Sequence, residues 1–204
     1  MPITAAVLNC TLKRSGGDAS STDRLLDGLL AELRSLDVEI GQVVRVADHD
    51  VKPGVTSDEG DGDEWPKIRQ QIIDAEILVL GSPIWMGQPS SIAKRVLERL
   101  DAFLGEKDDE GRLLSSGKVA VVATVGNEDG AHHVAAEIYQ SLADVGFTIP
   151  ANAQTYWVGE AMGSVDYKDL DAVPDKVQQT NRDVARNANH LAKLLQADPY
   201  PVGD

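Results

Sequence analysis

Cysteine is almost absent from this sequence of 204 residues, which contains a single one, Cys10. A lone cysteine forms no internal disulfide, and it excludes a metal site built from several thiolates. Positive charge is scarce as well, because 19 Lys and Arg stand against 33 Asp and Glu. The formal net charge of −14 makes nucleic acids and anionic membranes poor partners, since their phosphates would be repelled.

Long hydrophobic runs are also missing. No apolar run approaches the ~20 residues that span a bilayer, and the start of the chain, MPITAAVLNC, lacks the basic segment and apolar core of a signal peptide. These absences predict a cytoplasmic protein with no membrane partner. With 42% hydrophobic residues, the chain is long enough for one well-buried domain and hardly for two. We expect one domain over residues 1–197 and a loose tail over residues 198–204.

The sequence does contain a regular alternation of short apolar runs with amphipathic stretches. The runs predict buried strands at residues 3–8, 38–46, 77–80, 119–125 and 147–157. Apolar residues at helical spacing predict helices at residues 25–36, 65–74, 92–104, 134–145 and 177–195. An acidic stretch, residues 58–64, predicts a solvated loop. This order predicts an α/β protein, in which a parallel sheet is covered by helices on both faces.

In an open parallel sheet, ligands bind beyond the carboxyl ends of the strands, so the loops that follow the strands are the candidate site. The first such loop, residues 9–26, enters a helix whose start carries Ser20 and, three residues later, Asp23, a helix-capping pattern. Free amides at a helix start attract anions. Together with nearby hydroxyls and a cation they suit a phosphate monoester, although a plain polar loop is an equal alternative. The expected ligand contacts here are Thr11, Lys13, Ser20, Ser21 and Thr22.

Two phosphate-binding patterns are absent from this loop. It has neither the G-x-G-x-x-G dinucleotide fingerprint nor the G-x-x-x-x-G-K-[ST] nucleotide loop, so a mononucleotide cofactor is favoured over ATP. A low-molecular-weight phosphatase would need an arginine six residues after Cys10, and Gly16 stands there instead. Cys10 is therefore expected to be a small wall residue and not a nucleophile.

The next loop places a Trp and a Met side by side, in the segment Gly81–Pro89 (GSPIWMGQP). Followed by Lys94, this segment resembles the second flavin loop of the flavodoxin-like NAD(P)H-dependent FMN reductase and quinone reductase family. The segment Thr124–Gly130 (TVGNEDG) is similar to the third flavin loop, and the resemblance covers roughly residues 3–157. It implies flavin contacts at Pro83, Ile84, Trp85, Met86, Gly87, Thr124, Gly126, Asn127, Glu128, Asp129 and Gly130. A core plug or a subunit contact is the alternative role for the Trp and the Met.

The resemblance also implies a fold and a reaction. The fold is a flavodoxin-like, doubly wound sheet of five strands in the order 2-1-3-4-5. The reaction takes a hydride from NADPH or NADH to FMN and on to a quinone or another small electron acceptor, and family members form homodimers or homotetramers. The flavin does the redox chemistry, so we expect no catalytic side chain. Backbone amides near Trp85–Gly87 and Asn127–Gly130 would stabilise the reduced ring, and Lys13 would neutralise the phosphate.

Two other functions fit the same motifs. A flavodoxin-like electron carrier would bind FMN and pass single electrons between proteins, and the strong negative charge of the chain suits such a carrier. A module that senses redox state would bind FMN without turnover. The chain is longer than a minimal carrier needs, with a substantial helix expected after Trp157, which favours the enzyme.

Overall fold

The expected alternation of strands and helices is present in the computed structural model, which describes residues 2–202. The strands are β1 (Thr4–Asn9), β2 (Glu39–Arg45), β3 (Ile77–Trp85), β4 (Gln88–Pro89), β5 (Val119–Gly126) and β6 (Gln154–Val158). The helices are α1 (Ser21–Ser35), α2 (Trp65–Ile73), α3 (Ser91–Leu100), α4 (Ala131–Asp144) and α5 (Asp175–Ala197), with 3-10 turns η1 (Val46–Asp48), η2 (Asp101–Gly105) and η3 (Tyr167–Asp169). No helix among residues 2–202 is long and apolar enough to cross a membrane.

The sheet has the order β2-β1-β3-β5-β6, and all of these neighbours pair in parallel. This is the expected order 2-1-3-4-5, because the short β4 lies off this path and pairs only with β3, in the antiparallel sense. The flavodoxin-like topology is thereby confirmed.

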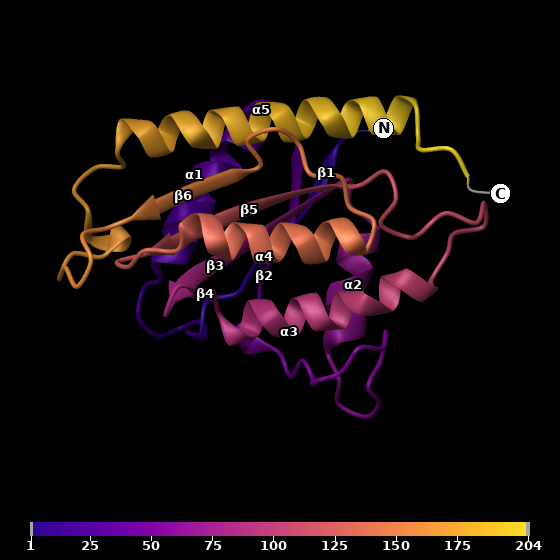
Figure 1. Cartoon of the computed structure of the whole chain (residues 1–204), viewed down its shortest axis with the longest axis horizontal. Helices are drawn as coiled ribbons and strands as arrows, with labels where there is room; N and C mark the ends of the chain where they lie inside the picture. Colours follow the sequence, from indigo (N-terminus) through magenta and orange to yellow (C-terminus); the bar gives the residue numbers. More distant parts are fainter. Residues whose placement is uncertain (1, 203–204) are drawn as a thin grey trace.

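Helices cover both faces of the sheet, and each face has its own apolar core (Figure 1). On one face, leucines of α1 such as Leu25 and Leu29 and small residues of α5 such as Ala188 pack on alternate strand residues. On the other face, α2, α3 and α4 cover the remaining strand residues. Because β1, β3 and β5 are buried on both faces, they read as continuous apolar runs in the sequence.

Strand β3 is longer than its apolar run predicts. We expected it to end at Leu80, with Gly81–Pro89 as a turn, but the strand continues to Trp85. Parallel pairing with β5 extends from Ile77 as far as Pro83, which overrides the turn propensity of glycine and proline. The last strand, in contrast, is shorter than expected. We expected a strand over residues 147–157, but β6 includes only residues 154–158.

The end of the chain leaves the fold after α5. Residues Asp198–Val202 are exposed and lack regular structure, and the Tyr200 hydroxyl lies 3.1 Å from that of Thr148. Gly203 and Asp204, which belong to the expected tail, lie outside the described residues. The division into a domain and a tail stays a prediction.

The acidic segment between η1 and α2 is anchored to the protein by an ion pair that the sequence pattern did not reveal. The side chains of Arg99 and Asp63 are fully buried, with Nη2 and Oδ2 2.8 Å apart. The same guanidinium donates to the carbonyl oxygens of Thr56, at 3.1 Å, and Lys52, at 2.9 Å. Exposed acids of this segment do lie in a solvated loop, but Asp63 instead ties that loop to α3.

Replacing Arg99 with Met should lower the free energy of unfolding by about 3–5 kcal/mol, because it leaves the Asp63 carboxylate buried without its cation. Urea unfolding followed by circular dichroism measures the change. Arg186→Met is the matched control, since its pair with Asp183 lies on the surface of α5 and should contribute little. Equal losses in both variants would contradict a structural role for the buried pair.

Candidate active site

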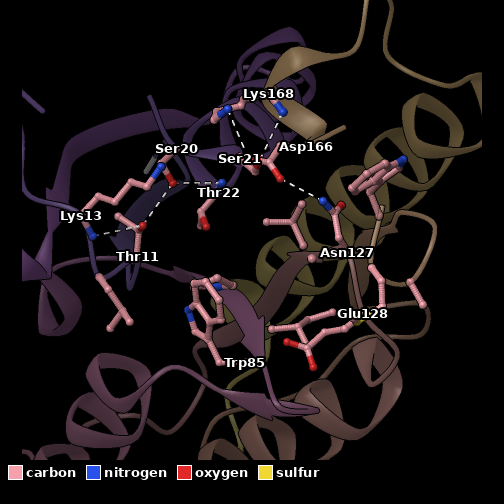
Figure 2. Close-up of a pocket in the computed structure, with 18 residues that line it drawn as sticks. Thr11, Lys13, Ser20, Ser21, Thr22, Trp85, Asn127, Glu128, Asp166 and Lys168 are labelled. Atoms are coloured by element: carbon pink, nitrogen blue, oxygen red, sulfur yellow. Dashed lines mark hydrogen bonds and ion pairs between the residues drawn. The ribbon is translucent and has the colours of Figure 1, made fainter. Parts of the chain in front are cut away.

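One cavity of about 470 Å³ opens at the carboxyl edge of the sheet. The register explains its position, since Asn9 pairs with Gly81, and Val125 pairs with both Pro83 and Trp157, so the strands end side by side. Figure 2 shows the side chains that line the cavity. They are Thr11, Leu12, Lys13, Ser20, Ser21, Thr22, Pro83, Ile84, Trp85, Val125, Gly126, Asn127, Glu128, Trp157, Ala161, Met162, Asp166 and Lys168.

The polar end of the cavity is the start of α1. Ser20 caps this helix as the sequence predicts, and its hydroxyl accepts a hydrogen bond from the Thr22 amide at 3.2 Å. The same hydroxyl donates its hydrogen to Oγ1 of Thr11, at 3.2 Å. Through these two hydrogen bonds Ser20 holds the loop and the helix together.

Thr11 and Ser21 have spare hydrogens. Each hydroxyl accepts a hydrogen bond from the protein, Thr11 from Ser20 and Ser21 from the backbone amide of Lys168 at 3.2 Å. No acceptor within residues 2–202 takes the hydrogen of either hydroxyl, although hydroxyl groups readily donate. Both are therefore placed to donate to an anion at the helix start, where the helix dipole also favours negative charge.

The turn after β3 is a tight hairpin. Met86 and Gly87 have φ values of 52° and 72°, and they join the paired residues Trp85 and Gln88. Two successive residues in the left-handed region are typical of a type I′ turn. The carboxylate of Glu128 accepts hydrogen bonds from the amides of Met86, at 2.9 Å, and Gly87, at 3.1 Å. The amides that we expected to face a flavin ring are therefore hydrogen-bonded to Glu128.

The structure brings most of the expected site residues together in the cavity. Those that line it are Thr11, Lys13, Ser20, Ser21, Thr22, Pro83, Ile84, Trp85, Gly126, Asn127 and Glu128. Trp85 is 54% exposed, so its ring is available to a ligand. Lys13 donates from its ammonium group to the carbonyl oxygen of Ala19, at 3.1 Å, which places its charge beside the helix start.

The remaining expected residues do not line the cavity. Met86 is 90% exposed at the tip of its turn, and Thr124 is buried within β5, where it accepts from Gln154 at 2.8 Å. Gly130 and Gly87 pack against each other, since a Cβ at Gly130 would lie 2.8 Å from the Gly87 Cα. The absence of a side chain at Gly130 therefore allows two loops to pack closely. It does not make room for a ligand. Contacts of a cofactor with Met86, Gly87, Thr124, Asp129 and Gly130 stay a prediction.

The segment between β6 and α5, residues 159–174, forms a wall that our sequence analysis did not assign; we call it the fourth loop. Ala161, Met162, Asp166 and Lys168 line the cavity from it, and Trp157 does so from the end of β6. The rule that selects loops after parallel strands would have found it, because β6 also ends at this edge.

Two side chains hold the fourth loop in place. Arg24 of α1 donates from Nη1 to the carbonyl oxygens of Tyr167, Lys168 and Leu170, at 2.7 to 2.9 Å. Its guanidinium also lies 5.5 Å from the centre of the buried Tyr167 ring. From the other side, Nδ2 of Asn127 donates to Oδ1 of Asp166, at 2.9 Å. The loop is therefore fixed to both α1 and the β5–α4 connection.

Cys10 is a residue of the apolar core and does not line the cavity, so the expectation of a small wall residue is wrong. It is fully buried, and burial raises the pKa of its thiol well above the usual range. A protonated and inaccessible thiol is no nucleophile. Residues 2–202 also hold no group of His, Cys, Asp and Glu side chains that could bind a metal ion.

Comparison with known families shows to which family the chain belongs. The model of the NADPH-dependent FMN reductase family matches residues 4–163, which include the first three loops of the cavity. The chain belongs to this family. As the resemblance implied, it is therefore an FMN-dependent flavoprotein oxidoreductase that uses NAD(P)H.

Two relatives of this reductase-family protein match nearly all of its sequence. It is 35% identical over 212 residues to 8-demethyl-8-aminoriboflavin-5'-phosphate synthase of Streptomyces davaonensis, covering 98% of this chain and 81% of the synthase. It is 36% identical over 202 residues to the divalent metal cation transporter MntH of Mycobacterium bovis, covering 96% of this chain. The chain spans only 29% of the length of that transporter.

Solved structures show the same fold. The crystal structure of RosB with bound 8-demethyl-8-formylriboflavin-5'-phosphate has a TM-score of 0.86 and 34% identity, covering 97% of this chain and 82% of RosB. The apo form of the NADH:FMN oxidoreductase EMOB has a TM-score of 0.66 at 16% identity, covering 94% of this chain and 89% of EMOB. At 16% identity, the similarity to EMOB supports the fold alone.

Cys10 should not react with 5,5'-dithiobis(2-nitrobenzoic acid) in the native protein at pH 8, because the thiol is buried and protonated. Absorbance at the thionitrobenzoate band measures the reaction, and the protein unfolded in guanidinium should react with one equivalent. Rapid reaction of the folded protein would contradict the burial of Cys10.

Proposed function

We propose that the cavity binds FMN and that the protein passes hydride from NAD(P)H through this flavin to a small electron acceptor such as a quinone. The main support for the proposal is the arrangement of polar and apolar side chains around one cavity, in a chain that belongs to the FMN reductase family. At one end lie the start of α1 and the donors Thr11 and Ser21. Toward the other end the walls are apolar and aromatic, with Ile84 and Trp85 among them.

The residues present fit the two ends of FMN. The phosphate is a dianion that needs donors and positive charge, which the hydroxyls of Thr11 and Ser21, the start of α1 and Lys13 would supply. The ring is flat and apolar on its faces, which suits an indole such as that of Trp85. Asn127 keeps a buried acceptor, Oδ1, without a donor among residues 2–202, and a ring N–H would satisfy it.

FMN, when bound, supplies the hydride chemistry of this family. The chain holds and orients the cofactor, and its apolar side chains exclude water from the ring. Glu128 fixes the turn that carries Trp85, through the amides of Met86 and Gly87, and so sets the position of the indole. The reaction requires no proton transfer by a side chain.

A second candidate function treats FMN as the substrate. The synthase of Streptomyces davaonensis, 35% identical over 98% of this chain, is named for a flavin phosphate altered at position 8. RosB, with a TM-score of 0.86, was solved with another flavin phosphate altered at that position. These two likenesses favour chemistry on the flavin itself, in a cavity of the same kind.

One anaerobic experiment separates the candidates. The FMN-loaded protein is mixed with NADPH and with NADH, and the flavin absorption band near 450 nm is followed. Rapid bleaching, reversed by an added quinone, supports the reductase, whereas no bleaching by either nucleotide favours an electron carrier or a sensor. Mass spectrometry of the flavin after long incubation detects the second function, because an altered flavin mass would show that FMN is a substrate.

Trp85→Ala should weaken FMN binding roughly tenfold, because an aromatic contact with the ring is lost. Quenching of flavin fluorescence measures the affinity. Leu104→Ala is the matched control, since Leu104 is also an exposed apolar residue, on η2 and outside the cavity lining. Unchanged affinity in the Trp85 variant would refute the assignment of this indole to the ring.

Replacing Ser21 and Thr22 together with Ala should weaken FMN roughly tenfold, because hydrogen bonds to a charged phosphate are lost. Riboflavin, which has no phosphate, should bind the variant and the native protein alike. Isothermal titration with both ligands makes the comparison. Losses of the same size for the two flavins would move the phosphate to another part of the cavity.

A further inference from the structure

Lys168 of the fourth loop lies at the start of α1, although 147 residues separate it from Ser21. Its backbone amide donates to the Ser21 hydroxyl at 3.2 Å, and its side chain lines the cavity. Figure 2 shows Lys13 and Lys168 on opposite sides of Ser20, Ser21 and Thr22. The helix start is thus flanked by one cation from the first loop and another from the fourth.

The position of the Lys168 ammonium group is fixed by two carboxylates. Its Nζ lies 3.2 Å from Oδ2 of Asp166 and 2.5 Å from Oδ2 of Asp169, and its side chain is only 22% exposed. The ammonium group donates hydrogen bonds to Asp169 and Asp166, and these bonds, that to Asp169 first, raise the pKa of Lys168, so the group is charged at neutral pH. A cation held in place in this way loses little conformational freedom when a ligand binds.

Lys168 also completes the arrangement around the Ser21 hydroxyl. Since Ser21 accepts from the Lys168 amide, its hydrogen is left for a ligand that carries an acceptor. An anion that takes this hydrogen would lie next to the backbone of Lys168, within the region that the Lys168 side chain lines. Arg24 keeps the two elements at this separation, because it binds the carbonyl oxygen of Lys168 from the first turn of α1.

We infer that Lys168 recognises the phosphate of a flavin mononucleotide, and that the fourth loop thereby makes the site specific for phosphorylated flavins. This inference rests on the proposed binding of FMN in the cavity. Asp166 and Asp169 do not remove the attraction, because a phosphate dianion competes for the ammonium group at close range through charge-assisted hydrogen bonds. Arg24 and Asn127 act as positioning residues, since they hold the loop and are not assigned a contact with the phosphate.

The test compares the affinities of FMN and riboflavin in Lys168→Met. FMN should bind on the order of tenfold more weakly, because a charged hydrogen-bond donor to the phosphate is lost. Riboflavin binding should not change, and Lys168→Arg should restore most of the FMN affinity. Lys176→Met is the matched control, since Lys176 is exposed on α5 outside this cavity and its loss should alter neither affinity.

A second variant tests the same inference, because it should change the FMN affinity in the opposite direction. Asp169→Asn keeps the shape of an exposed side chain but removes a negative charge that holds the Lys168 ammonium group. FMN should then bind more tightly and riboflavin as before, because the ammonium group is released toward the phosphate and a like charge is removed. Weaker FMN binding in this variant would contradict the inference, even if Lys168→Met fails to fold.

Each remaining outcome also decides the matter. Equal losses of FMN and riboflavin in Lys168→Met would show that Lys168 only supports the wall, and unchanged FMN affinity would show that it makes no contact. Either result overturns the inference and leaves the proposed function standing, provided that the native protein binds FMN. Failure of the native protein to bind FMN would overturn the proposed function and this inference together.

Discussion

The parallel register of β1, β3, β5 and β6 is the constraint on which the site depends. Pairing of Asn9 with Gly81 and of Val125 with Pro83 and Trp157 brings the ends of four strands to one edge, so the loops that follow must converge there. The register is itself fixed by burial on both faces of the sheet, because a slip of one residue would exchange the side chains of the two cores. The loops therefore start from a rigid frame, which the two apolar cores hold in place.

On this frame the cavity is divided into a polar end and an apolar end. The start of α1 collects hydroxyls, amides and ammonium groups. Thr11 accepts from Ser20 and Ser21 accepts from the Lys168 amide, so both keep a hydrogen to donate. Ile84 and Trp85, by contrast, line the cavity with apolar and aromatic side chains. The proposed ligand, FMN, has a phosphate at one end and an aromatic ring at the other, and it would match both ends of this cavity.

Sequence analysis could predict the strands, the helices and the first three loops because their signals are local. Hydrophobic periodicity located β1 and α1, the loop rule then led to Ser21, and the family resemblance led to Trp85. The features that it missed depend on contacts between distant parts of the chain. Gly81–Pro83 has the composition of a turn, but pairing with β5 makes it strand. Arg24 and the fourth loop are joined across 143 to 146 residues, and Arg99 meets Asp63 only through the tertiary fold. No pattern within a short window of sequence reports such pairs.

The bond between Arg24 and the fourth loop has a consequence for the order in which this protein assembles. The first turn of α1 is made early in synthesis, whereas its carbonyl partners at Tyr167, Lys168 and Leu170 emerge much later. Until then α1 also lacks the covering surface of α5, against which its leucines pack. A nascent chain that ends before α5 therefore exposes an oily helix beside a half-built pocket. The apolar face of α1 is covered in full only after residues 159–197 have been made.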